Sequence, residues 1–241
     1  YNCDVRDCLA VLEATGTERA LMVGLSRGAG TSLFTAALKP ERVAGVVAIG
    51  STVYELVDGH PWRADDFEED AGDDGWLRFS RASWRRDFPG FVEHFVREML
   101  PEPHSEKQIE DCIGWGLEAG HEVLERTMDA PIGYETRAEA EAFVSAVRCP
   151  VLAIHGDDDR ISPPAAGERI AELTGGELVI LEGSGHTPQA RDPVKVNALI
   201  EAFAQRVLGP APLPERRWRR ALGRGKRAIY VSSPIGLGHA R

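Results

Sequence analysis

Short apolar runs alternate along the chain with segments whose apolar residues recur every three or four positions. The runs contain almost no polar residue, as is typical of strands buried on both faces of a parallel sheet; they span 21–23, 43–49, 151–154 and 178–181. The periodic segments predict helices over 4–14, 31–38, 165–173 and 193–207. Alternation of the two predicts an α/β fold whose mostly parallel sheet is flanked by helices.

The pattern changes between about residues 51 and 131. An acidic loop over 65–74, expected to be solvated surface, leads into segments rich in Trp and Phe. A Ser-x-x-Gln pattern at Ser105 and a Thr-x-x-Glu pattern at Thr136 predict capping boxes that each start a helix. The segment therefore reads as a mainly helical insertion between two strands.

The last part of the chain differs in composition from the rest. Residues 209–227 are rich in proline and then in basic residues, which predicts a linker, and a new apolar run follows at 228–231. The sequence thus predicts one domain over 1–208 and the start of a second, truncated domain over 228–241.

The first apolar run ends in the pattern Gly24-x-Ser26-x-Gly28, and a helical segment follows. A tight strand-to-helix turn of this kind holds a serine in a strained conformation with its hydroxyl above the sheet edge. Gly24 and Gly28 fit such a turn because a Cβ at either position would collide where strand and helix meet. The N–H of Arg27 would then point at a developing oxyanion. The alternative is a turn whose glycines serve packing only.

Charge and cysteine content limit the partners and the compartment. Eight of the 28 basic residues lie in 213–241 with a single Glu, so residues 1–212 hold 20 basic and 37 acidic residues. A net charge near −17 in this main body disfavours a nucleic-acid partner. Four cysteines without metal-ligand spacing predict thiols in a reducing cytoplasm. No apolar run approaches the length of a membrane span. The first residues show no charged-then-apolar pattern, and because the chain opens on Tyr1 rather than Met, its start is expected to be missing, so this says nothing about a signal peptide.

Two further patterns lie at strand ends. Gly156-x-x-Asp159-x-x-x-Pro163 follows the third apolar run, and Gly185-His186 follows the fourth. Together with Ser26, these patterns resemble the α/β-hydrolase fold family, in which nucleophile, acid and histidine occur in that order. The resemblance covers about residues 1–208 and implies that residues 51–131 form the family's helical lid.

The resemblance assigns Ser26 as nucleophile, His186 as base and Asp159 as the acid. A serine hydroxyl barely ionises at neutral pH, so it needs a base within hydrogen-bond reach. Asp157 and Asp158 compete with Asp159 for the acid role, and the Gly-x-x-Asp spacing favours Asp159.

The family's second oxyanion donor comes from a loop ahead of the serine turn. The chain begins at the helix that leads into this turn, so the fold is expected to be incomplete at the N-terminus and only the Arg27 N–H is carried over. Aromatic residues of the lid are candidates for an acyl pocket, with core packing as the alternative; they are Trp76, Trp84, Phe91, Phe95 and Trp115.

The end of the chain resembles the opening of a two-Rossmann-domain (GT-B) glycosyltransferase. That family's first strand runs into a Gly-x-Gly-His loop, here Gly236-Leu237-Gly238-His239. The resemblance covers about fourteen residues, makes His239 a candidate base and implies a fused glycosyltransferase.

These observations predict a cytoplasmic serine hydrolase that cleaves a carboxylic ester or similar small acyl substrate through an acyl-enzyme. The resemblance implies no metal and no organic cofactor. An acyltransferase or a cofactor-free peroxidase would use the same three residues. A non-catalytic small-molecule-binding or scaffold module, fused to the glycosyltransferase, is the alternative from another class.

Overall fold

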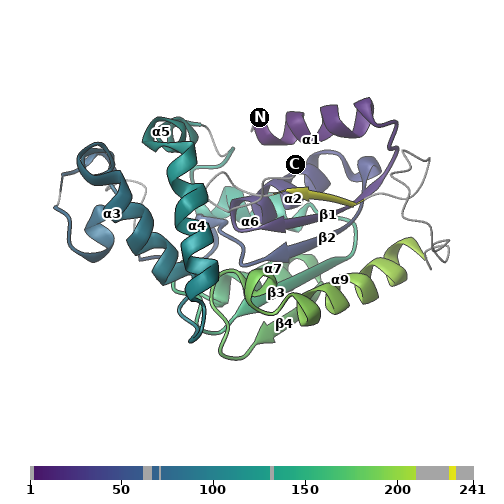
Figure 1. Ribbon diagram of the computed structural model, residues 1–241. Helices are drawn as coiled ribbons and strands as arrows, with labels where there is room; N and C mark the ends of the chain where they lie inside the picture. Colours follow the sequence, from purple (N-terminus) through teal and green to yellow (C-terminus); the bar gives the residue numbers. More distant parts are fainter. Residues whose placement is uncertain (1–2, 62–66, 71, 131–132, 210–227, 232–241) are drawn as a thin grey trace.

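The sheet at the centre of the protein has five parallel strands in the order β4-β3-β2-β1-β5. A computed structural model describes residues 3–61, 67–70, 72–130, 133–209 and 228–231 (Figure 1). The strands are β1 (Ala20–Leu25), β2 (Val43–Ile49), β3 (Val151–Gly156), β4 (Glu177–Leu181) and β5 (Ala228–Val231). The four strands expected from the apolar runs and their parallel arrangement are therefore confirmed.

Helices cover both faces of this sheet. They are α1 (Cys3–Ala14), α2 (Arg27–Leu38), α6 (Arg137–Ser145), α7 (Ala165–Thr174), the short α8 (Pro188–Arg191) and α9 (Pro193–Leu208). Single 3₁₀ turns span Pro40–Arg42, Tyr54–Leu56 and Gly75–Arg78. Met22 and Val46 pack in one apolar cluster with α1, α2, α6 and α7, whereas Val23 and Val47 pack with α9 on the opposite face. This alternation follows from the two-residue period of a strand and explains why the strands carry no polar face.

Three helices form the insertion between β2 and β3 (Figure 1). They are α3 (Arg81–Met99), α4 (Glu106–Ala119) and α5 (His121–Asp129), and we call them the helical insertion. They enclose an aromatic core of their own in which Trp84 and Phe91 are 0% and 1% exposed. Full burial of one such side chain stabilises the folded state by about 1.5–3 kcal/mol, so the insertion has a hydrophobic core that contributes to its stability.

One of the two predicted capping boxes is present. Thr136 accepts from the Glu139 N–H, and the Glu139 carboxylate accepts from the Thr136 N–H, as predicted for the start of α6. The box predicted at Ser105 is wrong, although a helix does begin at Glu106. Ser105 has φ −95° and ψ 10°, not the extended backbone that a capping serine adopts, and its hydroxyl makes no cap bond.

The acidic loop lies at the surface and is paired with α3. Arg86 binds Asp70 and Asp73 at 3.1 and 2.8 Å, and Arg81 binds Glu68 at 2.8 Å. The carboxylates of Glu68, Asp70 and Asp73 are thus exposed, as expected, and their charges also attach the described part of the loop to the helical insertion.

The strand expected at 228–231 is present as β5 and pairs with β1 at the edge of the sheet. The sequence placed it at the start of a second domain; here it adjoins the strand that leads to Ser26. Most of the linker and the Gly236–His239 motif lie outside the described residues, so the second domain stays a prediction. Within the described ranges, no helix is long and apolar enough to cross a membrane.

Candidate active site

Ser26 occupies the turn between β1 and α2 with strained backbone angles, φ 56° and ψ −122°. Its N–H donates to the Ile49 carbonyl at 2.8 Å, which ties the turn to the end of β2. A Cβ on Gly24 would lie 2.2 Å from the Gly28 carbonyl oxygen. The close approach predicted for this turn is therefore confirmed, and no side chain larger than hydrogen fits at position 24.

The strand register brings the ends of β1, β2 and β3 together. Leu25 pairs with Ile49, and Ile49 pairs with Ile154, so the residues that follow each strand share one edge of the sheet. Gly50 follows β2 with φ 47°, and a Cβ there would lie 3.2 Å from His186 Nδ1. The histidine therefore lies against the edge position next to Ser26.

Asp159 and His186 form a buried pair. His186 Nδ1 is 2.9 Å from Asp159 Oδ2, and the two side chains are 2% and 0% exposed. Asp159 Oδ1 accepts from the N–H groups of Ile161 and Ser162, both at 2.9 Å. Burial alone would raise the pKa of Asp159, but His186 and His155 outweigh it and hold that pKa well below its usual range. An ionised carboxylate thus faces His186.

The two competing aspartates lie elsewhere. Asp157 accepts from the Gly183 N–H at 2.6 Å, whereas Asp158 pairs with Arg160 at 3.1 Å on the surface. Only Asp159, of the three, is placed against His186, in agreement with the Gly-x-x-Asp spacing.

The Ser26 hydroxyl has a neighbour that the sequence did not indicate. Ser26 Oγ lies 3.5 Å from the Thr52 hydroxyl, and Thr52 is 5% exposed. In the described part of the chain, Ser26 Oγ makes no hydrogen bond to His186, so the structure brings together the acid and the histidine but leaves the serine contact open. Catalytic hydrogen bonds are often long or unformed before substrate binds.

The histidine loop is held by a glutamate that sequence reasoning missed. Glu102 Oε1 accepts from the Gly185 N–H at 2.7 Å, although the two residues are 83 positions apart. A Cβ on Gly185 would lie 2.4 Å from Pro101 Cδ, so the chain following α3 packs directly against this loop. In the sequence, Glu102 is a carboxylate between two prolines, and this arrangement matches no known functional motif.

Arg27 contributes the first N–H of α2, and its side chain reaches two other segments. Its Nε is 3.2 Å from Asp4 Oδ2 in α1, and its Nη1 donates to the Thr127 carbonyl in α5 at 3.2 Å. The serine turn is therefore attached to both the first helix and the helical insertion.

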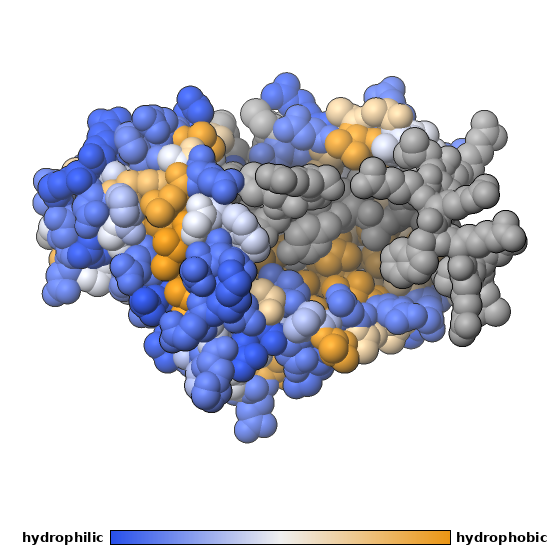
Figure 2. Space-filling view, in the orientation of Figure 1, coloured by the Kyte–Doolittle hydropathy of each residue, from blue (hydrophilic) through white to orange (hydrophobic). Residues whose placement is uncertain are grey.

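The aromatic candidates separate into three environments. Trp84, Phe91 and Phe95 are buried inside the helical insertion, Trp76 packs edge-on to Phe95 at a ring separation of 6.0 Å, and Trp115 is 42% exposed. Figure 2 shows hydrophobic residues among hydrophilic ones on the surface of this insertion.

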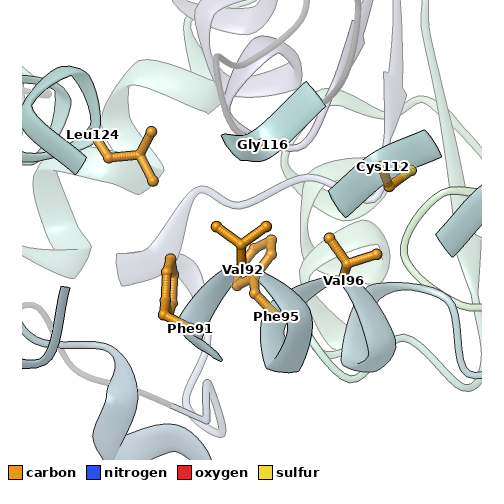
Figure 3. Close-up of a pocket in the computed structure, with 7 residues that line it drawn as sticks. All are labelled: Phe91, Val92, Phe95, Val96, Cys112, Gly116 and Leu124. Atoms are coloured by element: carbon orange, nitrogen blue, oxygen red, sulfur yellow. The ribbon is translucent and has the colours of Figure 1, made fainter. Parts of the chain in front are cut away.

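Phe91 and Phe95 line an apolar pocket between α3, α4 and α5 (Figure 3). Its lining residues are Phe91, Val92, Phe95, Val96, Cys112, Gly116 and Leu124. Ser26, Asp159 and His186 are not among them, so this pocket is separate from the polar cluster. Among the described residues, no group of three or more His, Cys, Asp or Glu side chains could hold a metal ion.

Known proteins with similar sequences are hydrolases. The chain is 25% identical over 193 residues to a pimeloyl-(acyl-carrier protein) methyl ester esterase of Neisseria meningitidis, with 78% of this chain and 57% of that protein aligned. It is 28% identical over 211 residues to a 2-hydroxymuconate semialdehyde hydrolase of Pseudomonas sp. strain CF600, with 84% and 69% aligned. The chain thus spans little more than half the length of the first of these relatives.

Solved structures share the fold. An esterase from Exiguobacterium antarcticum superposes with a TM-score of 0.68 at 17% identity, covering 83% of this chain and 72% of that one. A bromoperoxidase from Bacillus anthracis gives 0.66 at 20% identity, covering 83% and 72%. The family model described as the alpha/beta hydrolase fold matches residues 3–193. With the strand order and the serine turn, this match shows that the chain belongs to the α/β-hydrolase fold family.

Proposed function

We propose that this protein is a serine hydrolase that cleaves a carboxylic ester or a similar acyl substrate. The observation that carries the proposal is the buried Asp159–His186 contact of 2.9 Å at the sheet edge where the strained Ser26 lies. Strain of this kind costs about 1–3 kcal/mol and persists at functional sites, where it positions a reacting group.

In the proposed reaction, Ser26 Oγ attacks the acyl carbonyl while its proton moves to His186 Nε2. The imidazolium then gives this proton to the leaving alkoxide, and an acyl-enzyme remains. Water attacks the acyl-enzyme, passes a proton to His186, and the acid leaves as Ser26 regains its proton. Asp159 holds the imidazole as the Nδ1–H tautomer and stabilises its cation throughout.

The Arg27 N–H is the proposed oxyanion donor. It is the first N–H of α2 and has no partner carbonyl one turn earlier in the helix, as holds for every helix start. A helix N-terminus also favours the negative charge that develops on the carbonyl oxygen.

The substrate is proposed to be a small molecule with an acyl or ester group, and the helical insertion is proposed to act as a lid. Phe91 and Phe95 are buried in its core and line a pocket that is separate from Ser26, Asp159 and His186, so core packing is the role that we assign to them. Trp84 is 0% exposed and has a packing role in the same core.

The relatives support ester hydrolysis over the other reactions of this fold. Their names specify an ester bond in one case and a hydrolase in the other. The bromoperoxidase shares the fold at 20% identity, which adds no argument for peroxidation. A cytoplasmic location is part of the proposal, in keeping with the free thiols of Cys8, Cys112 and Cys149.

The proposal is tested by intact-mass analysis after treatment with a fluorophosphonate. One adduct on the full chain and none on Ser26→Ala is the expected result, because only an activated serine reacts. Hydrolysis of p-nitrophenyl esters of increasing chain length then reads out the acyl preference. A folded chain that forms no adduct contradicts the proposal and favours a non-catalytic binding module.

A further inference from the structure

A second histidine contacts the carboxylate that holds His186. His155, the fifth of the six residues of β3, is 1% exposed, and its Nε2 lies 3.0 Å from Asp159 Oδ2. The same Nε2 is 3.0 Å from the Ser162 carbonyl oxygen. No step of the proposed reaction uses this residue, although it is as deeply buried as the acid itself.

The protonation of His155 follows from its neighbours. Both atoms next to Nε2, a carboxylate oxygen and a carbonyl oxygen, can only accept a hydrogen bond. Nε2 must therefore carry a proton, which it donates to the Ser162 carbonyl oxygen while Asp159 Oδ2 lies 3.0 Å from the same nitrogen. The donor role of this ring nitrogen is thus decided by the contacts themselves.

Helix α7 keeps the ring in place from the other side. A Cβ on Gly167 would lie 2.9 Å from His155 Nδ1 and 3.2 Å from its Cβ. The imidazole therefore fills the space that a side chain at Gly167 would occupy. A glycine inside a helix destabilises it by about 1 kcal/mol relative to alanine, and here that cost makes room for the ring.

The contact completes the shell around Asp159. Oδ1 accepts from two main-chain N–H groups, and Oδ2 contacts His186 Nδ1 at 2.9 Å and His155 Nε2 at 3.0 Å. Each oxygen is therefore in contact with two nitrogen atoms, which restrains the plane of the carboxylate. Without His155, the oxygen that orients His186 would be in contact with His186 alone among these two histidines.

We propose that His155 is a positioning residue that fixes Asp159 Oδ2 and thereby keeps His186 as the Nδ1–H tautomer with Nε2 free to accept the Ser26 proton. The effect of His155 on the reaction rate rests on the proposed function. Its effect on the His186 tautomer can be measured without any turnover. His155 itself touches neither the serine nor the site of attack.

The first variants are His155→Leu, which cannot donate, and His155→Gln, whose amide N–H can reach the same oxygen. In His155→Leu, kcat for a p-nitrophenyl ester is expected to fall roughly 10–100-fold with KM within about 2-fold, because a small misplacement of a base is costly. His155→Gln is expected to recover most of kcat. His94→Leu, which removes a histidine of the insertion that packs on Trp76, is the matched control and should keep wild-type kcat.

Long-range ¹H–¹⁵N NMR of the His186 ring gives a readout independent of turnover. The full chain and His155→Gln should show the Nδ1–H tautomer, whereas His155→Leu should show a mixture of tautomers. If the wild type hydrolyses no ester but this difference is present, the proposed function fails while the positioning role holds.

A third variant covers the case in which His155→Leu fails to fold. Gly167→Ala raises helix propensity but crowds the His155 ring, so it should disturb the same tautomer signal in a folded protein. The proposal is overturned if His155→Leu or Gly167→Ala leaves the tautomer and kcat unchanged. Equal losses in the Leu and Gln variants overturn it too, because packing rather than the N–H would then be responsible.

Discussion

The N–H of His186 donates to the Met99 carbonyl, at the last residue of α3, over 3.1 Å. The histidine loop is therefore hydrogen-bonded to the helical insertion, which the chain reaches long before it reaches β4. Glu102 adds a second bond to the same loop through Gly185. The end of α3 thus belongs to the framework of the site, and any opening of the insertion would have to leave this end in place.

Replacing Glu102 should loosen the histidine loop. Glu102→Leu removes the acceptor of the buried Gly185 N–H, which should cost about 1–3 kcal/mol in free energy of unfolding. Urea unfolding measures this loss, and kcat for an ester should fall with it. Glu102→Gln is the matched control, because its amide oxygen still accepts from Gly185. Equal stability of the Leu variant and the wild type would show that the bond contributes nothing.

The strain at Ser26 predicts an ordering of two inactive variants. Ser26→Gly should be more stable than Ser26→Ala by about 1–3 kcal/mol, because glycine adopts φ 56° without a clash of its Cβ. Both variants should lose fluorophosphonate labelling. Thermal or urea unfolding of the pair measures the difference, and an Ala variant as stable as the Gly variant would argue against strain at this turn.

Features decided within a few residues could be predicted from the sequence. The serine turn was recognisable because Gly24 must lack a side chain where β1 meets α2, and the Thr136 capping box needs only its own backbone angles. The parallel strands were recognisable because burial on both faces removes polar residues from their sequence.

Contacts between distant segments were not predictable in this way. Glu102 meets Gly185, 83 positions away, because the fold brings the end of the insertion to the histidine loop, and Glu102 has no local pattern. The same holds for β5, whose strand character is local but whose place beside β1 is not. Ser105 shows that a local sequence pattern can also fail. It has the Ser-x-x-Gln pattern of a capping box, but its backbone is not extended and its side chain forms no cap.

Gly24 and Gly30 form a matched pair for testing the packing of the serine turn. Gly24→Ala would place a Cβ 2.2 Å from the Gly28 carbonyl oxygen, which must shift the main chain and should cost more than about 3 kcal/mol. Gly30→Ala meets its nearest neighbour, Val53 Cγ2, at 3.4 Å and lies inside α2, so it should be neutral or stabilising by up to about 1 kcal/mol. Soluble yield and urea unfolding distinguish the two. Similar behaviour of both variants would refute the close approach at Gly24.

Glu125 should make the helical insertion sensitive to acid. Its bond to Arg85, together with bonds to Arg81 and His121, lowers the pKa of Glu125 from 4.5 to about 2 despite its burial. A carboxyl group whose pKa is lower in the folded state stabilises the protein fully above the unfolded value, and this contribution is lost as pH falls from 4.5 towards 2.

The stability gap between wild type and Glu125→Gln should therefore be largest above pH 5 and should shrink as the pH falls below about 4.5. Urea unfolding of both proteins at pH 7, 4.5 and 3 measures this gap. Lys107→Gln is a useful control, because it breaks an exposed ion pair with Asp111 on α4 and should change stability by less than about 0.5 kcal/mol. A gap of constant size from pH 7 to pH 3 would mean that the ion pairs of Glu125 do not stabilise the insertion, and that the aromatic core alone holds α3 and α5 together.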